Sequence, residues 1–133
     1  AGFLGLDLRH GRADMLRAVF EGVAFSIAEA ADALPEFVDT AALYLAGGGS
    51  LHQSWRQLLC DLLGKTLFVV ENPNASARGA AMLGGRAAGT MEKSGAGLLV
   101  AEQVEPDPSA HEVLTVAFER WKEAATGIGH APR

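Results

Sequence analysis

Apolar residues recur at spacings of three and four along the first third of the chain. This recurrence predicts an amphipathic helix over residues 12–34. Its inward face is expected to consist of Leu16, Phe20, Val23, Ile27, Ala30 and Leu34. Pro35 is expected to end the helix. Gly22 lies in the helix interior, where glycine costs about 1 kcal/mol relative to alanine, so we expect another segment to pass close to it.

Two short apolar runs bounded by turn residues predict β-strands at 41–46 and 66–70. Neither run alternates with polar residues, so both strands are expected to be buried on both faces. A helical pattern separates the two runs, and strands joined through a helix are expected to pair in parallel. This order of elements predicts the α/β class, with strands flanked by helices.

The predicted helix between these strands follows a run of three glycines, 47–49. Ser50 and Gln53 have the spacing of a capping box, which predicts that the helix begins at Ser50. Gly64 is expected to end it. Its apolar stripe consists of Leu51, Trp55, Leu58, Leu59 and Leu62.

The second half of the chain predicts two more helices and one uncertain extended segment. Ser76 is expected to cap a helix over 76–88, whose small residues predict tight packing against a neighbour. Residues 98–100 fit either an edge strand or an extended arm. The last helix is predicted over 106–125. Its inward residues are expected to be Val113, Leu114, Ala117, Phe118 and Trp121.

Composition and charge exclude several classes of protein. The formal net charge of −5, with no basic run, argues against nucleic-acid binding. The apolar stretches are shorter than the roughly 18 residues of a membrane span, and no signal-peptide pattern is present, so we expect a cytoplasmic protein without membrane contact. The single cysteine, Cys60, is expected to be buried, and the scattered histidines predict no metal site. Because the chain opens without methionine, we expect it to be a piece of a longer protein.

The junction between the first predicted strand and its helix carries the clearest candidate chemistry. Glycines 47–49 allow a ligand to approach the backbone, and the following helix directs N–H groups and a positive dipole end toward an anion. By itself the pattern is weak. A tight turn without any ligand explains the three glycines equally well.

Several ordered motifs resemble one known family. Ala1, Phe3, Gly5 and Leu6, followed by residues 14–15 and 18–21, resemble the second signature of the FGGY carbohydrate kinases. The same order continues, as in xylulokinase-type members of the family, through residues 47–50, 55–57, 61–64 and 79–83. The resemblance extends from residue 1 to about residue 121.

The resemblance implies the C-terminal lobe of an actin-like, ribonuclease H-like ATPase fold. Residues 1–126 would be the C-terminal nucleotide-binding segment of a sugar kinase, and residues 127–133 a flexible tail. The enzyme would transfer the γ-phosphate of ATP to a sugar hydroxyl, with xylulose favoured, using ATP/ADP and Mg²⁺.

The same resemblance implies which residues meet the nucleotide. Gly47, Gly48 and Gly49 would run beside it, with Gly48 nearest the α-phosphate. Ser50 and His52 would edge the adenine or the ribose. A solvated histidine on the first turn of a helix is an equal alternative for His52.

The resemblance also implies what this chain does not contain. The family's catalytic base, most ligands of Mg²⁺ and the β- and γ-phosphate cradle come from an Asp-x-Gly-Thr loop and a Gly-Asp-Gln segment, and neither motif occurs here. We therefore expect no catalytic residue in this chain, dependence on a missing N-terminal lobe, and inactivity of the chain alone. Without the hairpin strands of the lobe, an open sheet edge would favour self-association, for example as a homodimer. A noncatalytic actin-like module for nucleotide sensing or assembly is the alternative.

Other polar residues of these motifs are expected to have structural roles. Trp55 is expected to pack in the core, Arg56 and Gln57 to bridge to neighbouring loops, and Asp61 to make a local hydrogen bond or surface pair. Arg17 and Glu21 lie one helical turn apart and predict an ion pair.

Overall fold

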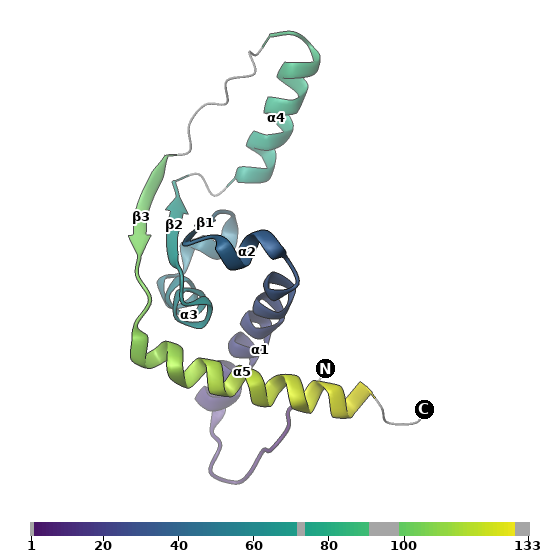
Figure 1. Cartoon of the computed structure of the whole chain (residues 1–133), viewed down its shortest axis with the longest axis vertical. Helices are drawn as coiled ribbons and strands as arrows, with labels where there is room; N and C mark the ends of the chain where they lie inside the picture. Colours follow the sequence, from purple (N-terminus) through teal and green to yellow (C-terminus); the bar gives the residue numbers. More distant parts are fainter. Residues whose placement is uncertain (1, 72–73, 91–98, 130–133) are drawn as a thin grey trace.

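The computed structural model describes residues 2–71, 74–90 and 99–129 of the chain (Figure 1). Helix α3 lies against a small sheet, and α1 and α5 pack against α3. The elements are α1 (Arg12–Asp32), α2 (Pro35–Asp39), β1 (Ala42–Leu45), a 3-10 turn (Gly48–Leu51), α3 (Gln53–Leu63), β2 (Thr66–Val70), α4 (Ala75–Ala87), β3 (Val100–Val104) and α5 (Pro108–Gly129). The predicted α/β class is confirmed.

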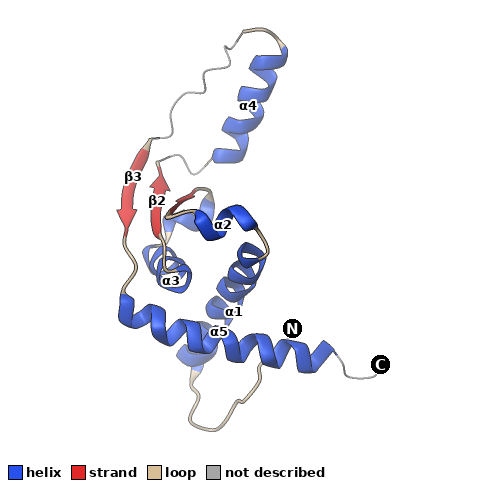
Figure 2. Ribbon diagram, viewed as in Figure 1, coloured by secondary structure: helices blue, strands red, loops and turns tan. Residues whose placement is uncertain are grey.

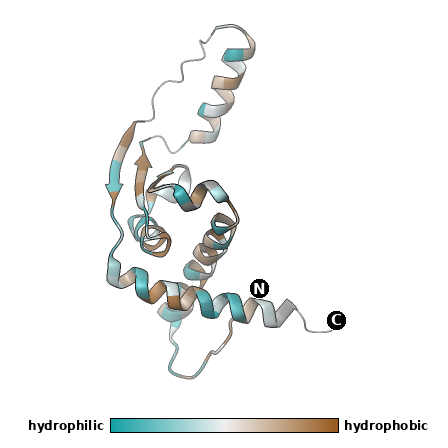
Figure 3. Ribbon diagram, in the orientation of Figure 1, coloured by the Kyte–Doolittle hydropathy of each residue, from teal (hydrophilic) through white to brown (hydrophobic). Residues whose placement is uncertain are grey.

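The sheet has the order β1-β2-β3, with β2 in the centre (Figure 2). Strands β1 and β2 pair in parallel, with Ala42 opposite Thr66, as predicted for strands joined through a helix. Strand β3 pairs antiparallel to β2. The colouring of Figure 3 is hydrophobic along β2, which fits its central position. In β1, by contrast, Tyr44 is 60% exposed, so the expectation of a strand buried on both faces is wrong there.

The core lies between the sheet and helices α1, α3 and α5. Phe25 of α1 contacts the aromatic rings of Phe118 and Trp121 of α5, at ring-centre distances of 5.6 and 5.9 Å. The buried hydrophobic residues are Ala24, Phe25, Ala28, Leu59, Cys60, Leu62, Leu67, Val69, Val70, Val104, Leu114 and Phe118. Among the described residues, no helix has the length and apolarity needed to cross a membrane.

The predicted inward face of α1 is wrong. The side chains that α1 buries are Ala24, Phe25 and Ala28, which lie on a neighbouring face of the helix. The residues predicted to face inward are exposed: Leu16, Phe20, Val23, Ile27, Ala30 and Leu34. Two alanines and a phenylalanine are sufficient for the contact because small side chains let α1 approach α3 and α5 closely.

Two further expectations about α1 also differ from the structure. The helix ends at Asp32, and Pro35 forms the first residue of α2, where the missing N–H of proline costs nothing. A Cβ placed at Gly22 would meet no atom within 4 Å, so no described segment passes close to this glycine.

Helix α4 stands away from the sheet (Figure 1) and begins with Asn74 as its N-cap rather than Ser76. No residue of α4 is buried, and a Cβ at Gly79 or Gly84 would meet nothing within 4 Å. The predicted tight packing of this helix is therefore wrong for the part of the chain that the structure describes.

The last two elements start later than predicted. Strand β3 begins at Val100, whereas the extended segment is expected at 98–100, of which residue 98 lies outside the described residues. Helix α5 begins at Pro108, just after Asp107, whose carboxylate accepts hydrogen bonds from the backbone N–H groups of Ser109 (2.8 Å) and Ala110 (3.4 Å). Of the predicted inward residues of α5, Val113 is exposed. The helix continues to Gly129, beyond the predicted limit at 125.

Candidate functional site

The glycine loop follows the carboxyl end of β1 and leads into α3. Gly47 has a φ of 96°, in the region that disfavours side chains, so a glycine is required there. Its carbonyl oxygen accepts hydrogen bonds from the Ser50 backbone N–H (3.1 Å) and the Ser50 hydroxyl (2.7 Å). These two bonds close the loop on itself and bury Ser50.

The predicted capping box at Ser50 and Gln53 is wrong. Ser50 belongs to the 3-10 turn, and α3 begins at Gln53 with His52 as its N-cap. The His52 carbonyl oxygen accepts hydrogen bonds from the backbone N–H groups of Trp55 and Arg56, both at 3.1 Å. The His52 side chain is exposed and makes no capping hydrogen bond. The positive φ of Gly47 turns the chain before Ser50, which is why the helix starts later than the local sequence predicts.

The two faces of the glycine loop differ in what they contact. A Cβ at Gly48 would meet nothing within 4 Å, whereas a Cβ at Gly49 would lie 3.4 Å from the indole nitrogen of Trp55. Trp55 is half-buried and also contacts the ring of Phe20, with ring centres 6.1 Å apart. The loop is therefore supported by Trp55 on one side and open on the other, at Gly48.

The structure brings all five predicted site residues into one short segment, because Gly47, Gly48, Gly49, Ser50 and His52 surround the 3-10 turn. Whether they contact a nucleotide stays a prediction. Their roles in the loop differ: the hydroxyl of Ser50 is used inside the loop, while the side chain of His52 and the backbone at Gly48 are open to a ligand.

Polar residues of α3 connect the helix to β3 and the segment after it. Arg56 Nη1 forms an ion pair with Glu102 at 2.9 Å, and Arg56 Nε is buried without a hydrogen-bond partner. Gln57 Nε2 donates to the carboxylate of Asp61 (2.7 Å) and to the carbonyl of Glu105 (3.1 Å). The predicted bridge from Gln57 to a neighbouring loop is confirmed, whereas Arg56 connects α3 to strand β3 itself and not to a loop.

The carboxyl end of α3 is held by residues from the start of α5. The Asp61 carboxylate is buried and accepts a hydrogen bond from the backbone N–H of Asp107 at 2.9 Å. His111 Nδ1 donates to the Asp61 carbonyl at 2.7 Å, and its ring covers Gly64, which ends α3 in the left-handed conformation as predicted. Sequence reasoning misses His111, because no local pattern marks it.

Two other predictions about side chains are confirmed. Arg17 Nε and Glu21 Oε1 form an ion pair at 2.6 Å. Cys60 is buried, and its burial raises the pKa of the thiol to about 11, so the thiol stays protonated and unreactive at neutral pH. Among residues 2–71, 74–90 and 99–129, no group of three or more histidine, cysteine or acidic residues could hold a metal ion.

Comparison with known proteins decides the family. The model of the FGGY family of carbohydrate kinases, C-terminal domain, matches residues 1–88. This chain belongs to the FGGY family of carbohydrate kinases.

Relatives of this FGGY domain include sugar kinases of two specificities. The xylulose kinase of Bacillus subtilis (strain 168) is 32% identical over 90 residues, which are 67% of this chain and 18% of that kinase. The gluconokinase of Bacillus licheniformis is 33% identical over 92 residues, which are 68% of this chain and 18% of that enzyme. The matched region thus spans less than a fifth of the length of these curated relatives.

Solved structures confirm the predicted fold. The crystal structure of xylulose kinase from Rhodospirillum rubrum matches with a TM-score of 0.78 and 25% identity, over 96% of this chain and 27% of that one. FGGY sugar kinases have the actin-like ATPase fold, and this chain forms part of it.

Proposed function

We propose that this FGGY domain is the ATP-binding C-terminal part of a carbohydrate kinase that transfers the γ-phosphate of ATP to a sugar hydroxyl. Xylulose is the favoured acceptor, because proteins named as xylulose kinases are among the relatives of this chain in both sequence and structure. The observation that supports nucleotide binding is the open face of the glycine loop at Gly48.

Two features of the loop support a phosphate site. Gly48 leaves room for a ligand against the backbone, and α3 follows with the positive end of its dipole directed toward the loop. Gly47 and Gly49 set the path of the loop beside the ligand. His52, exposed at the start of α3, would border the adenine or ribose. Ser50 would stabilise the loop through the hydrogen bond from its hydroxyl to the Gly47 carbonyl.

Phosphoryl transfer requires groups that this chain is proposed to receive from elsewhere. When bound, ATP supplies the phosphoryl group and Mg²⁺ neutralises its developing charge. We place the catalytic base and most ligands of Mg²⁺ in an N-terminal lobe of the same protein. The chain alone would then bind nucleotide weakly and catalyse no transfer, since positioning supplies most of the rate enhancement. A kinase of this kind would act in the cytoplasm, where ATP is made.

The test of nucleotide binding is calorimetric titration of the 133-residue chain with ATP and with ADP. We expect Gly48→Val to weaken both affinities at least tenfold, which corresponds to about 1.4 kcal/mol. Gly48 has no positive φ and no neighbour within 4 Å, so the valine fits the folded loop and removes only ligand space. Gly84→Val is the matched control, because Gly84 is equally open but lies on α4. Unchanged affinity of the Gly48 variant would exclude a nucleotide at this loop.

The test of catalysis is sugar-dependent release of ADP in a coupled assay with xylulose. We expect no turnover by the 133-residue chain and turnover by a longer form that carries the other lobe. Turnover by the chain alone would show that the catalytic groups have been misplaced. A longer form that binds ATP and ignores every sugar would instead support the noncatalytic module.

A further inference from the structure

The glycine loop has few side chains of its own to fix its shape. Gly47, Gly48 and Gly49 follow one another, and glycine loses more conformational freedom on ordering than any other residue. The carbonyl of Gly47 is held by the two hydrogen bonds that it accepts from Ser50. The rest of the run needs a contact from outside the loop to hold it in one conformation.

Trp55 supplies this outside contact. Apart from neighbours in the chain, it is the only described residue that comes within 4 Å of a Cβ placed at any of the three loop glycines. The indole edge that faces Gly49 consists of Nε1, at 3.4 Å from that Cβ position, and Cδ1, at 3.7 Å. These are ordinary van der Waals distances, so the indole lies beside the backbone of Gly49 without a clash.

The side chain of Trp55 is itself held in place. It is half-buried, packs against the core, and contacts Phe20 of α1, with ring centres 6.1 Å apart and ring planes tilted by 52°. Its backbone N–H donates to the His52 carbonyl at 3.1 Å, which fixes the residue in the first turn of α3. A rigid side chain anchored on two helices can therefore restrain a flexible loop.

The two restrained points of the loop flank its open face. Gly47 is held by Ser50 on one side, and Gly49 is held by Trp55 on the other. Gly48 lies between them, and a Cβ there would meet nothing within 4 Å. A loop that is already ordered loses less conformational entropy when a ligand binds, so these two restraints favour binding at Gly48.

We propose that Trp55 is a positioning residue for the nucleotide. By packing against Gly49, it holds the backbone at Gly48 in the conformation that the ligand meets. This inference rests on the proposed function, because the ligand is the nucleotide assigned there to the open face of Gly48. A purely structural Trp55 would contribute to the stability of the whole chain and to nothing specific in the loop.

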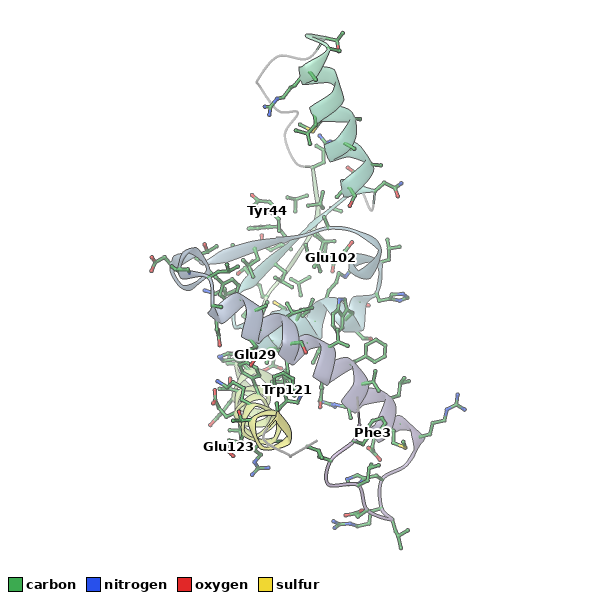
Figure 4. The ribbon with its side chains drawn as sticks, turned by 90° about the vertical axis from the view of Figure 1, so that its right-hand side faces the viewer. Phe3, Glu29, Tyr44, Glu102, Trp121 and Glu123 are labelled. Atoms are coloured by element: carbon green, nitrogen blue, oxygen red, sulfur yellow. The ribbon has the colours of Figure 1, made fainter. Side chains whose placement is uncertain are left out.

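Trp121 offers a matched control. It is also half-buried, but its aromatic partners are Phe25 and Phe118. Figure 4 shows Trp121 where α5 meets α1. It approaches none of the three loop glycines within 4 Å of their Cβ positions. Trp121→Ala therefore removes an equally large side chain from the packed helices without touching the loop.

The first experiment is hydrogen exchange of the 133-residue chain without nucleotide. The reporters are the backbone N–H groups of Ser50 and His52, which donate to the carbonyls of Gly47 (3.1 Å) and Gly49 (3.5 Å). We expect Trp55→Ala to raise both exchange rates at least about tenfold and Trp121→Ala to change them less than about twofold, because loop opening is separate from global unfolding. Equal increases in the two variants would overturn the positioning role.

The second experiment is calorimetric titration with ADP under conditions where every variant is folded. We expect Trp55→Ala to weaken binding at least about tenfold and Trp121→Ala less than about twofold, since only the first loosens the loop. Trp55→Phe keeps an aromatic ring beside Gly49 and should bind within about threefold of the parent chain. Unchanged affinity of Trp55→Ala, or equal losses in Trp55→Ala and Trp55→Phe, would overturn the role of Trp55 alone. A parent chain that binds no ADP would overturn the proposed function and this inference together.

The third experiment does not depend on whether Trp55→Ala folds. The sequence has two tryptophans, so Trp121→Phe leaves Trp55 as the single emitter. We expect its fluorescence to change on addition of ADP, with a midpoint at the calorimetric Kd, because the phosphate charge arrives one residue from the glycine that the indole contacts. Trp55→Phe leaves only Trp121 and controls for absorption by the nucleotide. Unchanged emission of Trp55 at saturating ADP would overturn the positioning role.

Discussion

Helices α1 and α3 look alike in sequence and differ in the folded chain. Both have an apolar stripe with helical spacing. In α3, Leu59 and Leu62 are buried between the sheet and α5, whereas in α1 the most regular stripe, Leu16 to Ile27, is exposed. Periodicity therefore predicts that a helix face needs an apolar neighbour, and it does not say whether that neighbour belongs to the same chain.

The largest difference between the two helices should appear in truncations to alanine. We expect Leu59→Ala to lower the free energy of unfolding by about 2–5 kcal/mol, because it leaves a cavity in the packed core. Val23→Ala should change it by about 0.5 kcal/mol or less, because Val23 is exposed. Urea unfolding at a concentration low enough to keep the chain monomeric measures both. Equal losses would show that Val23 is covered within the folded chain.

Replacing a glycine by alanine should have opposite effects on the stability of the chain in the two helices. Gly64→Ala should destabilise the chain by at least about 1 kcal/mol, because Gly64 is left-handed and a Cβ there would lie 2.8 Å from the ring of His111. Gly22→Ala should stabilise it by about 0.5–1 kcal/mol, because the position is helical and a Cβ meets nothing within 4 Å. Thermal unfolding of the two variants checks the pair. A destabilising Gly22→Ala would reveal a close neighbour that is not among the described residues.

The smallest expected effect concerns the start of α3. We expect His52→Ala to weaken ATP and ADP binding by a few-fold and to leave thermal stability unchanged, because the side chain is exposed and caps nothing. Gln53→Ala is the control, since Gln53 is exposed on the same turn. If calorimetry finds both variants equal to the parent chain, His52 is a solvated surface residue and α3 offers only its backbone to the ligand.

The sequence predicts this fold best where the signals are local. Strand β2 and the end of α3 at Gly64 both follow from short runs of residues, and both are confirmed. The capping box at Ser50 fails although its residues fit, because the positive φ of Gly47 makes the next residues a 3-10 turn. The buried face of α1 escapes the pattern because two of its three side chains are alanines, which contribute little to a hydrophobic periodicity.

In the candidate site, too, features set by adjacent residues can be predicted from the sequence, whereas contacts between distant segments cannot. Gly47 to His52 are adjacent in sequence, so a motif is enough to place them together. The contact of Trp55 with Gly49 and the ion pair of Arg56 with Glu102 depend on how α3 rotates against the sheet, and helix rotation is set by tertiary packing. The role of His111 at the end of α3 depends on the docking of a distant helix.

Because α4 lies between β2 and β3 in the chain, the connection between these two strands can change in length. Val70 pairs with Val100, and the backbone N–H of Glu71 donates to the Leu99 carbonyl at 2.9 Å. The two strands are thus neighbours in the sheet, and the segment that carries α4 leaves and returns at one point, as the tip of a long hairpin. Each doubling of such a connection costs only about 0.6 kcal/mol in closure entropy. This tip can therefore lengthen, shorten or accept an inserted domain while the register of β2 and β3, and the glycine loop beyond them, stay as they are.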